Sequence, residues 1–172
     1  MSIEGHFLIN YIEWYPSCYV TFQNLLPTPV ALLSKDGKQN IYVAPDAVEL
    51  VNLLGDEFTG YYDEIGFDWK RLAGARVTEI EGKAPFDYMD DLAATQAGNF
   101  LDHGIRVNSL FTSYRIANSA WSQRFGLFAG RSFPDQDYLI MEAIPVGRDD
   151  PEEVQVPFLA LYLGAPFKDK AS

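Results

Sequence analysis

The sequence predicts an α+β fold, and three observations carry that prediction. Two β-rich runs flank the tight-turn pair Asp36-Gly37, a strand, a turn and an amphipathic helix follow one another in residues 74–93, and two further β-rich runs begin at residue 137. A chain of 172 residues, 48% of them hydrophobic, is long enough for one well-cored domain and short for two. We therefore expect one globular α+β domain with additions.

The first element is a β-hairpin. Residues 29–34 and 39–44 are rich in apolar and β-branched residues and are joined by Lys-Asp-Gly-Lys. Glycine accepts the positive φ that a two-residue turn requires, so Asp36-Gly37 between two apolar runs is a strong hairpin signal. The pattern predicts two antiparallel strands.

Three short helical segments are expected next. Residues 45–55 have apolar positions at helical spacing and end in a glycine, and residues 56–66 repeat that spacing with acidic residues at their start. The apolar positions of the second segment are Phe58, Tyr61, Tyr62 and Ile65. Residues 67–74 predict one further turn of helix.

Residues 74–93, GARVTEIEGKAPFDYMDDLA, combine a strand, a turn and a helix. Ala75, Val77 and Ile80 mark the strand, with imperfect alternation, and Glu-Gly-Lys at 81–83 is the turn. Proline is well placed at the start of a helix, so we expect the helix to begin at Pro85 and to end at Gly98. Its apolar stripe is Phe86, Met89, Leu92 and Ala93.

The chain then leaves regular patterns. Residues 99–133 show neither helical nor strand periodicity, which predicts an irregular, partly helical excursion, and long excursions of this kind are often functional. We expect it to be packed by its larger apolar residues, Phe100, Leu110, Phe111, Trp121 and Phe125. Residues 137–147 and 154–164, joined by the polar turn at 148–153, predict a second hairpin.

Charge narrows the range of partners. The chain has 13 basic and 24 acidic residues, a net charge of -11, so nucleic acid and anionic membrane surfaces are unfavourable partners at long range. Solubility accounts for most of this acidity, and a preference for basic ligands stays an alternative. No run of about 18 apolar residues predicts a membrane span.

Metal and cofactor sites are not expected. Cys18 is the only cysteine, so the chain contains no internal disulfide, and no zinc-ligand spacing or phosphate loop occurs. The acidic run from Glu49 to Asp68 lacks the alternating ligands of a calcium loop and predicts a solvated face. In Asp102-His103-Gly104 we expect the aspartate to bond local backbone rather than orient a catalytic base.

Residues 74–93 resemble the half of a PDZ domain in which a strand ends in an Ile-x-Gly turn and leads into the helix beside the peptide groove. The resemblance implies a PDZ-like curved antiparallel sheet or partial barrel capped by two or three helices. It further implies an N-terminal extension over residues 1–18 with the Gly-His-Phe motif, and a PDZ-like domain over residues 19–172 with its insertion at 99–133. The peptide-groove candidates are Val77, Ile80, Gly82, Phe86 and Met89.

More of the chain is similar to one family. The stretches GHF, PTPVALLSKDGKQNIYV, FDWKRLAGARVTEIEGKAPFDYMDDLA, GNFLDHGIRVNSLFTSYRI and WSQRFGLFAG look like the N-terminal portion of fungal serine peptidases similar to the chlamydial protease-like activity factor, in the C-terminal-processing peptidase group. The resemblance assigns His6 as the general base of the parent peptidase, although Glu4 stands where that family has aspartate. In that family the serine nucleophile belongs to a later α/β domain.

This resemblance implies a PDZ-like regulatory or substrate-handling part of a serine endopeptidase, inactive alone because the nucleophile domain is absent. Its partners would be a peptide or protein substrate and the C-terminal peptidase domain of the parent chain. The family suggests secretion, yet residues 1–10 do not read as a signal peptide. A metal and a cofactor are not implied.

Two other functions are open. A stand-alone module could add a peptide strand to an exposed sheet edge, favoured by an open groove beside the helix at 85–97 and disfavoured if residues 99–133 fill that groove. A small enzyme would need His103 or His6 beside a serine or cysteine, with a carboxylate behind it. Capture of a terminal carboxylate by residues 124–130, RFGLFAG, is not expected, because that stretch lies far downstream.

Overall fold

A computed structural model describes residues 22–35, 37–97, 100–117, 120–132 and 134–162. The chain divides into two compact units. In one unit the described residues are β1 (Phe22–Leu25) and β9 (Leu159–Tyr162), which pair antiparallel. The other unit, residues 26–158, contains every other described helix and strand.

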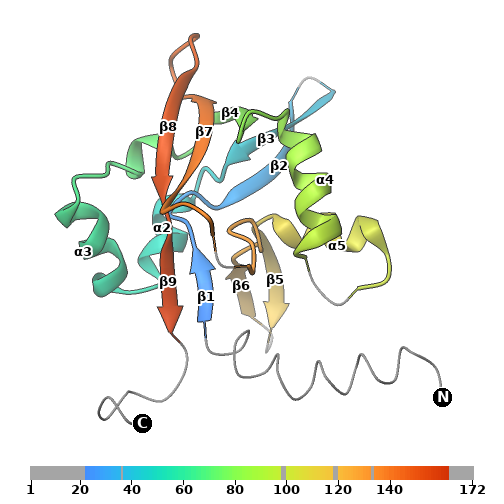
Figure 1. Ribbon diagram of the computed structural model, residues 1–172, viewed down its shortest axis with the longest axis horizontal. Helices are drawn as coiled ribbons and strands as arrows, with labels where there is room; N and C mark the ends of the chain where they lie inside the picture. The colour runs from blue at the N-terminus through green and yellow to red at the C-terminus, as the bar shows by residue number, and fades with distance from the viewer. Residues whose placement is uncertain (1–21, 36, 98–99, 118–119, 133, 163–172) are drawn as a thin grey trace. The chain divides into compact units, whose positions relative to one another are not determined.

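The larger unit is built on a five-stranded antiparallel sheet with the order β2-β3-β4-β7-β8 (Figure 1). Its strands are β2 (Val30–Lys35), β3 (Lys38–Val43), β4 (Arg76–Ile80), β7 (Tyr138–Ile144) and β8 (Glu152–Pro157). The sheet is not closed, so β2 and β8 are edge strands. Together with its helices, it confirms the predicted α+β class.

Both predicted hairpins form, but the second is shorter than the runs predicted at 137–147 and 154–164, because β8 ends at Pro157 and residues 159–162 pair with β1 instead. The register of the first runs from Val30↔Val43 to Lys35↔Lys38, and Gly37 takes the positive φ, 73°, that the two-residue turn requires. In the second, β7 pairs with β8 in the register Leu139↔Val156 and Met141↔Val154. These four residues are buried, and they alternate with partly exposed ones as expected for a sheet with one covered face.

The helices between β3 and β4 also match the sequence patterns. They are α2 (Ala47–Asn52), α3 (Asp56–Glu64) and the 3-10 turn η1 (Lys70–Leu72). In α3, Phe58 and Tyr62 are buried, and the Tyr62 hydroxyl donates to the carbonyl of Pro157 at 3.3 Å. Helix α3 is thereby tied to β8, the far edge of the sheet from β2.

The strand, turn and helix predicted in residues 74–93 are present. Strand β4 ends at Ile80, Gly82 has a φ of 73°, and α4 (Pro85–Thr95) starts with its proline in the first turn. A register shift between Val77 and Glu79 in the pairing of β4 with β7 explains the imperfect alternation. Because of this bulge, Val77 and Ile80 are both buried although they are three residues apart.

The excursion at 99–133 is more regular than its sequence predicted. It contains α5 (His103–Leu110) and a separate two-stranded hairpin of β5 (Ser113–Ala117) and β6 (Ala120–Arg124). The hairpin escaped prediction because its strands contain little apolar alternation. Leu110 and Phe111 are buried as expected, whereas the Phe100 side chain is 49% exposed.

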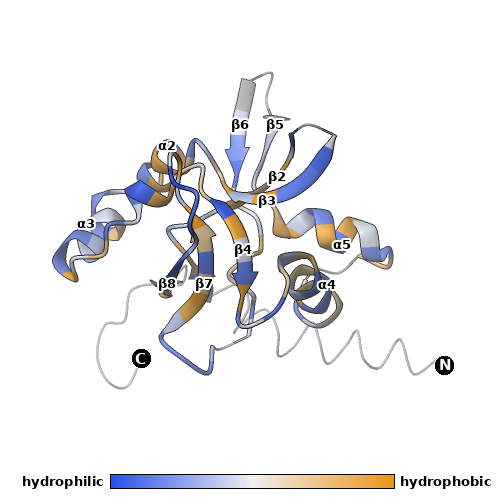
Figure 2. Ribbon diagram, turned by 90° about the horizontal axis from the view of Figure 1, so that it is seen from above, coloured by the Kyte–Doolittle hydropathy of each residue, from blue (hydrophilic) through white to orange (hydrophobic). Residues whose placement is uncertain are grey.

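The core lies between the sheet and the helices α4 and α5. Figure 2 shows hydrophobic segments along β4 and β7, two strands that contribute residues to this core. The largest fully buried side chains of this core cluster are Ile41, Leu72, Ile80, Met89, Leu110 and Met141, while Trp69, Tyr62 and Leu50 are fully buried outside it. Helix α4 contributes Met89, Leu92 and Ala93, so three of the four residues of its predicted apolar stripe are core.

Candidate functional site: a groove beside β2

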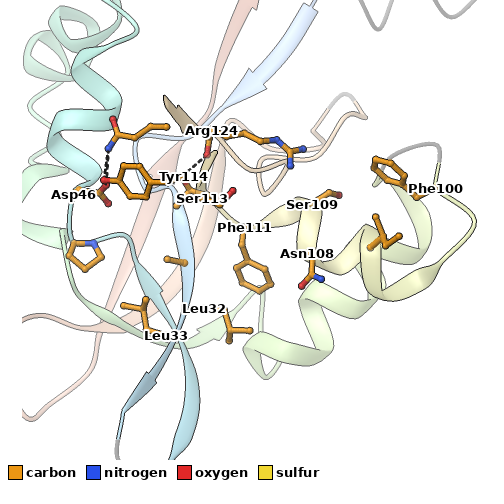
Figure 3. A pocket seen from close by; sticks show the side chains of 15 residues that line it. Leu32, Leu33, Asp46, Phe100, Asn108, Ser109, Phe111, Ser113, Tyr114 and Arg124 are labelled. Carbon is orange, nitrogen blue, oxygen red and sulfur yellow. Dashed lines mark hydrogen bonds between the residues drawn. The ribbon is translucent and has the colours of Figure 1, made fainter. Parts of the chain in front are cut away.

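A cavity of about 810 Å³ opens beside β2, within the larger unit (Figure 3). Four parts of the unit line it: β2, α5, the segment at 111–114 that leads into β5, and the end of β6. Pro45 and Asp46, at the start of α2, complete the lining. Stretches distant in the chain therefore meet around one hollow, and a volume of this size is typical of ligand sites.

The walls of this cavity are largely apolar. Leu32 and Leu33 come from β2, Phe100 and Ile105 from the region of α5, and Phe111 follows α5 directly. Leu33 is 38% exposed, and Phe100 and Ile105 are each 49% exposed. Large apolar side chains are thus left open to solvent around a concave surface, a pattern typical of binding sites.

No described strand pairs with the edge of β2 on the cavity side beyond Val30. The backbone N–H of Thr112 donates to the carbonyl of Val30 at 2.8 Å, so the backbone groups of Val30 point to this edge. The backbone groups of successive residues point alternately to the two sides of a strand, so those of Leu32 and Ser34 point to the same side as those of Val30. Among the described residues, no hydrogen bond reaches the outward backbone groups of Leu32 and Ser34.

A polar cluster ties the β5–β6 hairpin to the start of α2. The Tyr114 hydroxyl donates to the Asp46 carboxylate, and Gln123 Nε2 donates to the same Oδ2 atom at 2.7 Å and to the Tyr114 hydroxyl at 3.0 Å. The hydrogen bond to Asp46 raises the pKa of Tyr114. Because the carboxylate accepts two hydrogen bonds from the β5–β6 hairpin, its position is held within the protein and one end of the cavity has a fixed wall.

Helix α5 is positioned by its first residues. Asp102 caps it, accepting the Ile105 backbone N–H at 2.9 Å, which confirms the predicted local bond of this aspartate. His103 Nε2 donates to Asp90 Oδ1 of α4 at 2.5 Å, and Arg106 Nη2 donates to His103 Nδ1 at 3.5 Å. Both ring nitrogens of His103 are thereby engaged, neither by a serine or a cysteine, so these contacts hold α5 against α4 rather than form a catalytic dyad.

The residues predicted for a peptide groove lie elsewhere. Val77, Ile80 and Met89 are buried in the core, Gly82 is in the turn before α4, and Phe86 is 48% exposed on α4. The structure brings none of these five onto the lining of the cavity beside β2. His6 and Cys18 lie outside the described residues.

The space beside α4 is partly occupied by the segment that follows β6. A smaller cavity, about 410 Å³, remains there, lined by Tyr88, Leu92 and Gln96 on one side and by residues 129–130, 134–136 and 138–139 among others on the other. The Gln96 side-chain oxygen accepts the backbone N–H groups of Arg131 and Ser132 at 3.0 and 3.1 Å. Backbone donors next to RFGLFAG are thus bound by a side chain of the protein itself.

The sequence did not identify the residues of the groove that the structure reveals. The exposed apolar side chains of β2 looked like ordinary strand residues, and Tyr114, Gln123 and Arg124 belong to a hairpin that was not predicted. The available signal was the hairpin at Asp36-Gly37, which predicts one neighbouring strand for residues 30–35. Whether a second strand pairs with their other side, and so whether they form an edge, depends on the whole topology.

Within the described ranges no group of three or more histidine, cysteine, aspartate or glutamate side chains is placed to hold a metal ion. In the same part of the chain, no helix has the length and apolar character needed to cross a bilayer. Comparison of the chain with protein-family models, with curated proteins and with solved structures found no match. The resemblance to PDZ domains and to serine peptidases therefore stays a prediction from sequence.

Proposed function

We propose that this chain binds an extended peptide, which adds as a strand to the free edge of β2 and places its side chains in the adjoining cavity. The observation that carries the proposal is the coincidence of the two features. Within the described residues the outward backbone groups of Leu32 and Ser34 are unpaired, and Leu32 also lines an apolar hollow of about 810 Å³. In strand addition the backbone groups supply affinity and side-chain pockets supply specificity.

The dimensions suit a short segment. Leu32 and Ser34 offer two N–H and two C=O groups, which pair with about three to five residues of an added strand at about 3.3 Å per residue. Thr112 already occupies the carbonyl of Val30, so the added strand would pair from Leu32 toward Lys35. Alternate side chains of that strand would face Phe111 and Ile105 across the cavity.

A free edge strand can also be a protected surface with no ligand. Proteins discourage unwanted pairing with charged residues on the edge, and Lys35 at the end of β2 fits that role. Protection does not account for the exposed apolar side chains of Leu33, Phe100 and Ile105 beside the same edge. Binding explains both features, and Lys35 then limits how far the added strand extends.

The family resemblance places this binding in a larger context. If the resemblance is followed, the proposal is that the chain is the substrate-handling or regulatory part of a serine endopeptidase. It would then act together with the C-terminal peptidase domain of the parent chain. By itself it would bind peptides without cleaving them. The alternative of a stand-alone peptide-binding module uses the same groove, and a fragment and a module would differ only in what they are joined to.

Peptide binding is tested with fluorescein-labelled nonapeptides, acetylated and amidated, in which valine or leucine alternates with varied neutral and charged polar residues. We expect a subset to bind, measured by fluorescence anisotropy, and Ile105→Ser to weaken that subset about tenfold. Ile65→Ser is the matched control, because Ile65 ends α3, is 46% exposed and lies outside the lining.

A second variant tests strand addition itself. Leu32→Pro removes the outward N–H of Leu32, and proline is tolerated in edge strands where the N–H faces away from the ladder. We expect this variant to fold and to lose peptide binding. Absence of binding by the whole peptide panel, or full binding by the Leu32→Pro variant, would reject strand addition at β2.

A further inference from the structure

Arg124 is the one cationic side chain among the described residues that line the cavity. It is the last residue of β6, and its backbone carbonyl accepts the Thr112 hydroxyl at 2.7 Å, so its position beside the start of β2 is fixed. The side chain is partly buried. Figure 3 shows it extending from β6 away from Tyr114 and toward the α5 side of the cavity.

No carboxylate of the described residues pairs with the Arg124 guanidinium. Asp46 is the other charged residue of the lining, and it accepts from Tyr114 and Gln123 instead. The chain has 24 acidic against 13 basic residues, and elsewhere Arg71 and Arg148 both reach Glu152. A partly buried guanidinium that no described carboxylate pairs with, at an apolar cavity of an acidic protein, offers five N–H donors to an acceptor from outside.

We infer that the peptide bound beside β2 carries an acidic side chain that pairs with Arg124. The inference rests on the proposed function and gives the class of ligand that the groove takes. A planar guanidinium matches a carboxylate with two parallel hydrogen bonds, and such pairs are stronger than neutral hydrogen bonds. The surrounding apolar side chains exclude water from the pair and strengthen it further.

The backbone around the cavity favours an acidic side chain over a terminal carboxylate. Chain termini are captured by groups of free backbone N–H donors. Under the proposed function the outward N–H groups of Leu32 and Ser34 bond the backbone of the added strand, while Thr112 N–H bonds Val30 and Leu127 N–H bonds the carbonyl of Ser109 at 3.0 Å. The guanidinium of Arg124 is then the cationic donor of the lining that stays available for a carboxylate.

The net charge of -11 opposes an acidic ligand at long range, and in the lining itself the opposing charge is that of Asp46, whose carboxylate is bound by Tyr114 and Gln123. At physiological ionic strength the Debye length is about 8 Å, so distant surface carboxylates are screened. A direct ion pair in a partly buried site is screened much less. Local pairing with Arg124 therefore decides whether the groove prefers acidic peptides. Raising the salt concentration should lower the affinity for glutamate peptides less than it weakens an ion pair on the protein surface.

The test compares three versions of the tightest nonapeptide of the panel, with Glu, Gln or Lys at the position where glutamate binds best, all with amidated ends. We expect the Gln version to bind the native protein about tenfold more weakly than the Glu version, and the Lys version more weakly still. Arg124→Gln should abolish the difference in affinity between the Glu and Gln peptides while leaving the affinity for the Gln peptide unchanged. Arg124→Lys should keep part of the preference for the Glu peptide.

Arg131→Gln is the matched control, because it also removes a partly buried guanidinium but lies outside the lining of this cavity. It should keep the full preference for glutamate. Equal binding of Glu and Gln peptides to the native protein would overturn the role of Arg124 and leave strand addition standing, whereas no binding by any version rejects both. The same peptide with a free C-terminus is compared as well: a preference that requires this carboxylate, and ignores the internal glutamate, would assign Arg124 to a chain terminus and likewise overturn the inference.

Discussion

Gly126 packs so tightly against Leu110 that a Cβ atom at position 126 would lie 1.8 Å from the Leu110 carbonyl oxygen. The carbonyl carbons of Leu110 and Phe111 would be 2.5 and 2.6 Å away. The obstacle is backbone, which cannot move aside as a flexible side chain does. The segment after β6 is therefore locked to the end of α5 by the absence of a side chain at this glycine.

Gly126→Ala should destabilise the protein by about 3 kcal/mol, the upper range for an inserted methyl group in a packed region. Urea unfolding followed by circular dichroism measures the loss. Gly60→Ala is the control, since a Cβ atom on Gly60 of α3 would meet nothing within 4 Å, and alanine there should add about 0.5 to 1 kcal/mol of stability. A neutral Gly126→Ala variant would contradict the close packing of α5 and this segment.

Asp102→Ala should cost about 1 kcal/mol, because it removes the bond from the cap of α5 to the Ile105 N–H. Since α5 forms one wall of the cavity, the same variant should also weaken peptide binding. Asp87→Ala is a suitable comparison, as Asp87 lies in the first turn of α4 but does not cap it. Equal losses in the two variants would show that charge near a helix start, rather than capping, is what matters.

Met89→Ala should destabilise the fold by about 2 to 4 kcal/mol, since Met89 is 1% exposed in the core. Phe86→Ala, three residues earlier on the same helix, should cost less than about 1 kcal/mol, because Phe86 is 48% exposed. Thermal unfolding of both variants distinguishes a core role from a groove role for α4. Loss of peptide binding without loss of stability in Met89→Ala would return the groove to this helix.

Tyr88 makes the free energy of unfolding depend on pH in the alkaline range. Burial raises the pKa of its hydroxyl from 10.0 to about 12, with a smaller contribution from Glu81. The folded state therefore keeps the neutral form, so the stability that this group provides is complete below pH 10 and is lost as pH rises from 10 toward 12. The loss should approach about 2.7 kcal/mol once the hydroxyl is ionised in both states, because each pKa unit corresponds to about 1.36 kcal/mol.

The measurement is the free energy of unfolding at pH 9.5 and at pH 11.5, in the native protein and in Tyr88→Phe. The phenylalanine keeps the ring that packs edge-on against Phe128, with ring centroids 6.2 Å apart, and removes the titrating hydroxyl. It should show a smaller decline between the two pH values. The same decline in both proteins would assign the alkaline loss to other tyrosines, of which buried Tyr62 also has a raised pKa.

Local signals predicted most of the fold. Asp36-Gly37 fixed the first hairpin, Pro85 marked the start of α4, and the spacing of Phe58 and Tyr62 gave the buried face of α3. Each of these depends on residues close together in the chain, and so on turn geometry or helical period that a sequence displays directly.

The groove could not be predicted in the same way. Arg124 and Leu32 are about ninety positions apart, and they line one cavity because the β5–β6 hairpin folds beside an edge strand. The predicted groove residues Val77, Ile80 and Met89 were correct as apolar positions, yet apolar spacing does not separate a side chain in the core from one that lines a cleft. The register shift in β4, which turns both Val77 and Ile80 inward, has no local signature either.

The walls of the groove come from residues 31–33, 45–46, 123–124 and several positions between 100 and 114, so the hollow exists only once β2, the start of α2, α5 and the β5–β6 hairpin have folded together. A ligand held there favours the native state over the unfolded chain by mass action, by about 2.7 kcal/mol at a hundredfold excess over its dissociation constant. Heat resistance thus becomes a readout of occupancy. A melting-temperature screen of acidic β-forming peptides would find the natural partner even when its sequence is unknown.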